Sequence, residues 1–130
     1  MPLVRIEMLE GRPPEYRKAV LDGVHAALVE AFRIPPGDRN QVLHEHEREN
    51  FEIMEGKSVA FLIIEIVVFP GRSLEAKRKL YSAIVRNLSR SPGIAPDDVL
   101  IVLLEPPLTD WGIRGGQMAS DVPLGFKLDV

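Results

Sequence analysis

Pro2 is the residue whose type and position most directly suggest chemistry. It follows the initiator methionine and opens the strand-like run Pro2-Leu3-Val4-Arg5-Ile6. Methionine is usually removed ahead of a residue as small as proline, which would leave Pro2 with a free secondary amine. An α-amine has a pKa of about 7.7–8.0, and an apolar pocket lowers it because burial disfavours the charged form. General acid–base catalysis needs a group with a pKa near the working pH. Taken alone, Pro2 is more simply a proline at the start of a strand.

An internal repeat gives Pro2 more weight. With an offset of 60 residues, positions 2–45 match positions 62–105 in kind and without a gap, and the matches include Gly11-Arg12 with Gly71-Arg72, Asp38 with Asp98, and Val42-Leu43 with Val102-Leu103. Self-similarity at a fixed period indicates the architecture of a chain. Pro2 corresponds to Leu62, an internal residue without a free amine. A duplicated chain of this kind would keep one amine-bearing site and lose the other.

The hydrophobic pattern predicts the same order of elements in each half. Apolar, β-branched runs indicate strands over 3–9 and 61–69, a fourth strand over 99–104 and a weaker one over 40–44. Helices begin after Pro13-Pro14 and after the N-cap residue Ser73, and Pro/Gly pairs end them. A strand–helix–strand unit places its two strands in parallel. We therefore expect an α+β fold in which two tandem β-α-β repeats form a four-stranded sheet with both helices on one face.

Length and composition predict one domain over residues 1–130, with repeats at 2–45 and 62–105 and a C-terminal interface tail at 106–130. A chain of 130 residues can bury one core but not two. Cysteine is absent, which excludes a disulfide scaffold and thiolate-bound metal. The net charge is −3 with scattered basic residues, so no nucleic-acid partner is expected. No leader or membrane-spanning run is apparent, and we expect no membrane partner and a cytoplasmic protein.

The second face of the expected sheet has no cover. Strand 61–69 is apolar on both faces, yet the chain offers no third helix. Exposed apolar surface of that size marks an association face. Copies of this chain are therefore expected to pack their sheet faces around a symmetry axis.

Several motifs, taken in order, resemble one family. Pro2, the turn Leu9-Glu10-Gly11-Arg12 and the run from Trp111 to Ser120 resemble 4-oxalocrotonate tautomerase, whose tail reads FGIGGELAS after a proline-initiated β-α-β unit. The duplicated length is similar to the fused members of that superfamily, chiefly the malonate semialdehyde decarboxylase group. That group shares the proline-rich turn ending in Asp38-Arg39 and the pair Asp110-Trp111.

The resemblance implies a homotrimer whose amino-terminal proline is the catalytic acid or base. It assigns catalysis to Pro2, Arg72 and Asp38, and binding of a small carboxylate-bearing substrate to Arg114, Trp111 and Arg12. The decarboxylase group has two arginines in the loop after the third strand, whereas here the partner of Arg72 is Pro70. Arg114, an extra residue among the glycines of the tail, is a candidate replacement.

For each of these residues a purely structural role is the alternative. Arg12 is slightly better explained as a solvated charge, because its loop belongs to the half without the amine. For Arg114 the two explanations are even, and for Arg72 function is favoured. Asp38 suits a turn, and Trp111 could wall a pocket or fill a subunit interface.

The histidines support no metal site. His44 and His46 would share one face of a strand, but a closed site needs three or four ligands and no further cluster is visible. A polar strand end is the expected role, with no metal and no cofactor. His25 is expected at the edge of the core, and the acidic run 45–52 in a solvated loop.

Three functions remain open at this point. The first is a tautomerase acting on a 2-hydroxy-dienoate or a phenylpyruvate-like enol, in which the Pro2 amine moves a proton between oxygen and carbon and a cation stabilises the developing oxyanion. The second is a decarboxylase or hydratase of a short carboxylic acid, which the missing loop arginine disfavours. The third is a non-catalytic binding or signalling role, as a similarity to macrophage migration inhibitory factor would permit.

Overall fold

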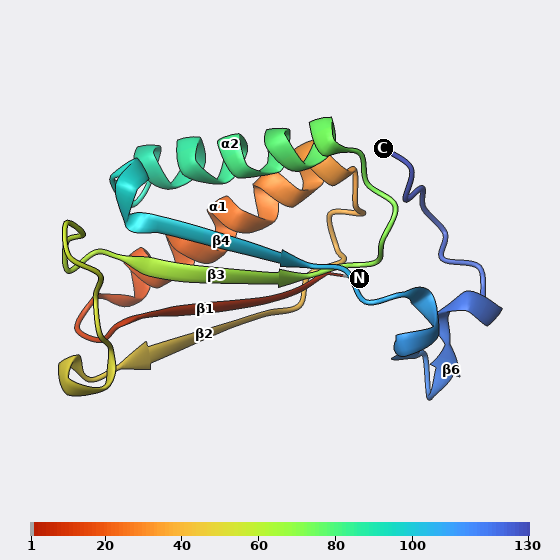
Figure 1. The fold of residues 1–130 in the computed structure, drawn as a ribbon, viewed down its shortest axis with the longest axis horizontal. Helices are drawn as coiled ribbons and strands as arrows, with labels where there is room; N and C mark the ends of the chain where they lie inside the picture. Colours follow the sequence, from red (N-terminus) through yellow and green to blue (C-terminus); the bar gives the residue numbers. More distant parts are fainter. Residues whose placement is uncertain (1) are drawn as a thin grey trace.

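A four-stranded sheet carries two helices on one of its faces (Figure 1). The computed structural model describes residues 2–130; Met1, and with it any statement on its removal, lies outside the described residues. The sheet has the order β2-β1-β3-β4. Its strands and the two covering helices are β1 (Leu3–Leu9), α1 (Pro14–Phe32), β2 (Gln41–His46), β3 (Leu62–Val67), α2 (Leu74–Arg90) and β4 (Val99–Leu104).

The strand register confirms the tandem repeat. β1 and β2 are parallel with Val4 opposite Gln41, and β3 and β4 are parallel with Leu62 opposite Val99, so both pairs have the same offset of 37 residues. β1 and β3 are antiparallel, and the pairs Val4–Ile66 and Ile6–Ile64 exchange when 60 residues are added or subtracted. The two β-α-β units are therefore related by an approximate two-fold axis between β1 and β3. This is the α+β fold that the sequence predicts.

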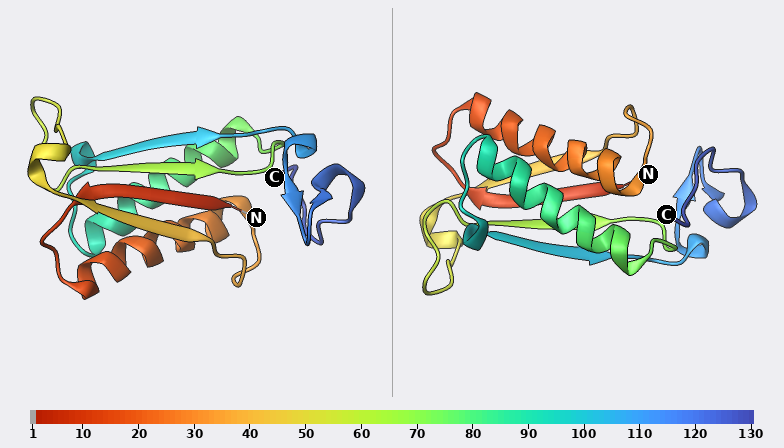
Figure 2. Two further views of the ribbon diagram at one scale, coloured as in Figure 1. Left: turned by 90° about the horizontal axis from the view of Figure 1, so that it is seen from below. Right: turned by 90° about the horizontal axis from the view of Figure 1, so that it is seen from above.

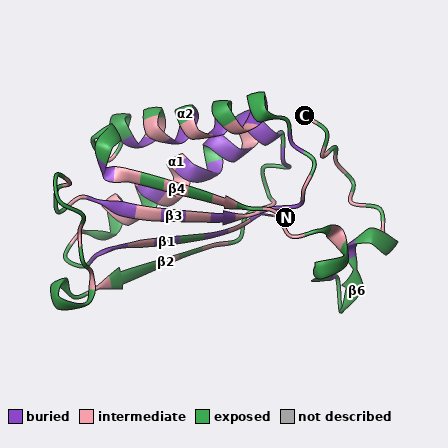
Figure 3. Ribbon diagram, viewed as in Figure 1, coloured by how far each residue is buried: buried purple, intermediate pink, exposed green. Residues whose placement is uncertain are grey.

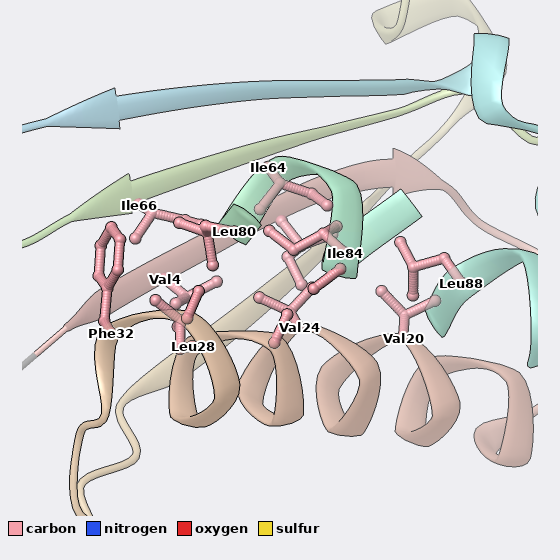
Figure 4. Packing of buried hydrophobic residues seen from close by; sticks show 14 of the residues in the cluster. Val4, Val20, Val24, Leu28, Phe32, Ile64, Ile66, Leu80, Ile84 and Leu88 are labelled. Atoms are coloured by element: carbon pink, nitrogen blue, oxygen red, sulfur yellow. The ribbon is translucent and has the colours of Figure 1, made fainter. Parts of the chain in front are cut away.

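The core lies between the helices and one face of the sheet (Figure 4). Alternate residues of β1 and β3 point toward the helices, as the two-residue period of a strand requires. Val24 and Leu28 of α1 and Leu80 and Ile84 of α2 are fully buried against them. The predicted cap of α2 is present, because the Ser73 hydroxyl accepts a hydrogen bond of 3.1 Å from the backbone N–H of Ala76.

The boundaries of two strands differ from the sequence prediction. β2 spans Gln41–His46, so the strand expected over 40–44 is shifted and longer, and part of the acidic run 45–52 is strand. β3 ends at Val67, earlier than the expected residue 69. One further ladder bond joins the Val68 N–H to the Leu104 carbonyl at 2.9 Å, after which Pro70 has no N–H to continue the ladder.

The other face of the sheet is open. Seen from that side the strands lie in front of both helices (Figure 2). Three side chains of β4 on this face, those of Leu100, Val102 and Leu104, are each more than two fifths exposed, and β2 and β4 show exposed positions along their length (Figure 3). No helix within residues 2–130 has the length and apolar content to cross a bilayer.

The segment after β4 lies beyond one end of the sheet, and the chain then returns toward the start of α2 (Figure 1). It contains two short paired strands, β5 (Gly112–Ile113) and β6 (Gln117–Met118). Val130 is bound to the start of α2, since its carbonyl accepts a hydrogen bond of 3.0 Å from the Ser73 N–H. Leu128 packs on Gly71, where φ is +124° and a Cβ would lie 3.3 Å from the Leu128 Cβ. Glycine at this position therefore serves both the turn and the close approach of the tail.

Candidate active site

Pro2 lies buried at the end of the sheet that the tail covers. Leu3 is paired with Val67, so Pro2 sits beside the stretch that leads out of β3. On its other side the Asn40 side-chain amide donates a hydrogen bond of 3.4 Å to the Pro2 carbonyl, and the Asn40 carbonyl accepts from the Val4 N–H at 2.9 Å. The backbone of Pro2 is thus held between the start of β2 and the end of β3.

A cavity of about 190 Å³ is present at this end of the molecule. Asp38, which lies two residues before Asn40, is in its wall, together with Phe69 from the stretch after β3 and Arg114 from the tail. The remaining lining is apolar and is supplied by Pro35, Ile113, Leu124 and Phe126. The cavity therefore combines one carboxylate and one guanidinium with apolar and aromatic walls, as a pocket for a small organic anion does.

Two aromatic residues support the wall that Phe69 forms. The Trp111 ring meets Phe69 edge-on at 4.8 Å between centroids, and Phe126 is stacked at 6.4 Å. The Trp111 indole N–H donates to the Pro106 carbonyl at 3.1 Å, which fixes the ring. Trp111 therefore packs behind the cavity wall and does not itself line the cavity.

Arg72 is buried in the body of the protein. Its side chain is 7% exposed, its guanidinium lies 4.9 Å from the centre of the Phe32 ring, and Nη1 donates a hydrogen bond of 2.9 Å to the Phe69 carbonyl. Burial lowers the pKa of Arg72, partly offset by the negative charges of Glu105 and Asp38. Arg72 thus places its charge near Asp38 and holds the backbone of Phe69, but it is not among the residues that line the cavity.

Arg114 is the guanidinium in the cavity wall. It has a left-handed backbone with φ at +50°. Nη1 and Nη2 donate to the carbonyls of Pro123 and Leu124 at 2.6 and 3.3 Å. Because both acceptors are neutral, these bonds position Arg114 without cancelling its charge. It also ties together two parts of the tail that form the wall.

Arg12 lies at the opposite end of the sheet. It lies three residues after Leu9, the last residue of β1, whereas Pro2 precedes the first. Because β1 has seven residues, the strand separates the two by about 20 Å. Its guanidinium lies 4.8 Å from the centre of the Tyr16 ring. Within one chain the structure therefore brings Pro2, Asp38, Arg72, Trp111 and Arg114 to one end and leaves Arg12 at the other.

The histidine pair shares one carboxylate partner. His44 Nδ1 and His46 Nε2 lie 3.1 and 2.9 Å from the Glu7 carboxylate on the open face of the sheet. No group of three or more metal-ligating side chains is present in the described part of the chain. His25 is buried at 8% exposure, with Nε2 2.7 Å from the Pro36 carbonyl.

Comparison with known proteins gives the family. Two family models, both described as tautomerase enzymes, match residues 2–62 and 38–114. The first match begins at Pro2, and the second covers more than half of the chain. The chain is a member of the tautomerase superfamily. It is 35% identical to the probable tautomerase YrdN of Bacillus subtilis (strain 168) over 122 residues, which cover 90% of this chain and 94% of that protein.

Other tautomerases and a decarboxylase are also similar. Over 53 residues, 41% of this chain and 84% of the relative, the chain is 43% identical to the 2-hydroxymuconate tautomerase of Comamonas testosteroni. Among solved structures, malonate semialdehyde decarboxylase superposes with a TM-score of 0.84 at 30% identity, covering 93% of this chain and 99% of the other. A symmetric trimer of fused 4-oxalocrotonate tautomerase does so with a TM-score of 0.80 at 27% identity, covering 91% and 96%.

The apolar walls of the cavity carry no sequence motif that identifies them. The sequence predicts a strand end at Phe69, which stands in place of one loop arginine of the similar dehalogenases, and does not predict a cavity wall there. Leu124 and Phe126 carry no motif and lie outside the repeat. Leu124 and Phe126 are apolar residues in a tail that is rich in Pro and Gly. An apolar residue in such a segment is a sign that the segment packs against the rest of the protein.

Proposed function

We propose that this member of the superfamily is a small-molecule tautomerase that uses the Pro2 amine, freed by removal of Met1, to move a proton between oxygen and carbon. The observation that carries the proposal is the burial of Pro2 at the end of the sheet that also holds the Asp38–Arg114 cavity. Burial lowers the pKa of an amine, and so favours the neutral form that accepts a proton. The tautomerase relatives support the same reaction class.

The proton returns to the substrate, so the reaction needs no second reactant. The neutral Pro2 nitrogen takes the proton from the enol hydroxyl and delivers it to carbon, which leaves the ketone and restores the free amine. Negative charge develops on the substrate oxygen meanwhile, and a cation fixed beside that oxygen stabilises the transition state more than the ground state. Arg114 fills this role, or binds the substrate carboxylate, because it lines the cavity.

The remaining candidates have supporting roles. Arg72 positions the Phe69 backbone and contributes a positive charge near Asp38. Asp38 presents a carboxylate in the cavity wall. Trp111 holds the Phe69 ring. The substrate class is a carboxylate-bearing enol such as 2-hydroxymuconate or phenylenolpyruvate.

The active form that we propose is a homotrimer built through the open sheet face. The exposed apolar side chains of β4 support this, as does the trimeric form of a fused tautomerase with a similar fold. An interface role for the tail, residues 106–130, remains part of the same proposal.

The experiment is a comparison of two amino termini. Enzyme with a free Pro2, checked by mass spectrometry, should ketonise phenylenolpyruvate, whereas enzyme with an added residue before Pro2 should be inactive because the nitrogen is then an amide. Pro2→Ala keeps a primary amine and should retain partial activity. Pro96→Ala, which changes the start of a short 3₁₀ helix of the second repeat, is the matched control. Full activity of the extended enzyme would refute the proline mechanism.

Decarboxylation is the second candidate, because malonate semialdehyde decarboxylase is similar over nearly the whole chain. Release of carbon dioxide from malonate semialdehyde, measured beside ketonisation on the same preparation, separates the two. Pro70 stands where that group has its second loop arginine, so we expect ketonisation to be far faster. The absence of both activities in enzyme with a free Pro2 would favour the binding role.

A further inference from the structure

A second cavity, of about 460 Å³, lies at the opposite end of the sheet from Pro2. It is built on the turn that follows β1 and is closed by residues from the segment between the two repeats. The lining residues are Leu9, Glu10, Gly11, Arg12, Arg48 and Val59. None of them belongs to the cavity that holds Asp38 and Arg114.

The approximate two-fold axis relates the segments that form the walls of the two cavities. The turn from Leu9 to Arg12 corresponds, at an offset of 60 residues, to the stretch from Phe69 to Arg72. Leu9 lines the second cavity as Phe69 lines the first. The segment after β2 supplies Arg48 and Val59, just as the segment after β4 supplies Arg114. The second cavity is therefore the duplicate of the first.

The duplicate lacks the groups that would move a proton. Leu62 stands in place of Pro2, is fully buried and offers no amine. Asp98 stands in place of Asp38, and its carboxylate is held by the Ser58 backbone N–H at 2.8 Å and the Ser58 hydroxyl at 2.6 Å. At the second end the amine is therefore absent, and the carboxylate of Asp98 is hydrogen-bonded to Ser58.

The positive charges, in contrast, are retained and accessible. Arg72 is buried, but its counterpart Arg12 is half-buried, with its guanidinium beside the Tyr16 ring and in the cavity wall. Arg48 is exposed. Within residues 2–130 neither Arg12 nor Arg48 forms an ion pair with an acidic side chain. Two guanidinium groups therefore line one cavity, and neither of them is paired with a carboxylate of the described chain, although Glu10 also lies in the wall.

We propose that this second cavity binds a small monocarboxylate without transforming it. Arg12 and Arg48 supply the donors that match a carboxylate. Leu9 and Val59 supply apolar surface for a short hydrocarbon or aromatic body. Glu10, also in the wall, adds a negative charge that disfavours dianions. The proposal is independent of the chemistry at Pro2.

The test is a titration of ¹⁵N-labelled protein with benzoate, followed by NMR. Saturable shifts of the Gly11 and Arg12 amides are expected, distinct from those of residues beside Pro2 such as Asn40. Arg12→Gln and Arg48→Gln should each weaken benzoate binding at this site about tenfold or more, the effect of losing a hydrogen bond to a charged group. Arg90→Gln, on an exposed arginine at the end of α2 and outside the cavity, should leave it unchanged.

Two results would overturn the proposal. One is a titration in which the Gly11 and Arg12 amides do not shift saturably, or shift equally in the Arg12→Gln, Arg48→Gln double variant. The other is loss of the Asn40 shifts, and not the Gly11 shifts, in Arg12→Gln. That outcome would mean that Arg12 serves the Pro2 site of a neighbouring subunit.

Discussion

Replacement of Arg114 by alanine should affect catalysis, whereas replacement of Arg72 by alanine should affect stability. Arg114 lines the cavity, whereas Arg72 is buried between Phe32 and the Phe69 carbonyl. We expect Arg114→Ala to lower kcat/KM for a carboxylate-bearing enol with little change in stability, and Arg72→Ala to lower stability first. Arg33→Ala is the matched control, because Arg33 is also exposed and also has a left-handed backbone, with φ at 55°.

The two magnitudes follow from the contacts. A hydrogen bond to a charged group contributes about 1.5–3 kcal/mol, so loss of Arg114 should reduce kcat/KM by roughly one to two powers of ten. Arg72 has one such bond and a contact with the Phe32 ring, which in a desolvated site adds about 2 kcal/mol. Burial of the charge, with Nε unpartnered within residues 2–130, offsets part of this gain. A net loss of about 1–3 kcal/mol, or a fall in Tm of roughly 4–12 °C, is expected.

Ketonisation kinetics and thermal unfolding, both at one protomer concentration, measure the two effects. An Arg72→Ala enzyme that kept its Tm but lost activity would show that Arg72 contacts the substrate and that the burial argument fails. If Arg114→Ala left kcat/KM unchanged, Arg114 would not contact the substrate or the developing oxyanion.

Three other perturbations test the fold and the cavity. The Ser58 hydroxyl and backbone N–H hold the pKa of Asp98 below its ordinary value, so Asp98→Asn should destabilise the protein above about pH 4 and its deficit should shrink as the pH falls through the folded-state pKa. Exposed Asp97→Asn is the control, and a pH-independent deficit would contradict this assignment. Val102→Lys on the open sheet face should dissociate the proposed trimer to monomers in light scattering, whereas Leu74→Lys on the helical side should not. Phe126→Ala should widen the cavity and raise relative kcat/KM for aromatic over aliphatic enols about tenfold; an unchanged ratio would exclude it from the substrate wall.

The architecture was predictable because its determinants are local and occur twice. Each half carries the same alternation of apolar strand, proline- or serine-started helix and second strand. The shared offset within both parallel pairs follows from connections of equal total length, although α1 has 19 residues and α2 has 17. The N-cap at Ser73 needs only the residues that follow it. Strand ends were less predictable, because pairing with a neighbour, such as Val68 with Leu104, decides where a ladder stops.

The direction of each arginine side chain depends on packing that the repeat does not encode. Arg12 and Arg72 occupy equivalent positions, yet only Arg72 has the Phe32 ring beneath it, because the position equivalent to Phe32 is Pro92 and the partner of Arg12 is Tyr16. Arg114 lines the cavity because two tail carbonyls hold it there. A sequence pattern identifies a charged residue near a site, but not which charge faces the ligand.

The two ends of the duplicated sheet differ in the segments that cover them. At the Pro2 end the tail brings Trp111 and Phe126 onto Phe69 and leaves a cavity of about 190 Å³. At the other end the shorter cover leaves a cavity of about 460 Å³ with Arg12 in its wall. A narrow, aromatic-walled site excludes water, which strengthens the interaction of a fixed cation with a developing oxyanion. The narrower end therefore suits the chemistry that we propose for the Pro2 amine, and the wider end suits the binding without reaction that we propose there.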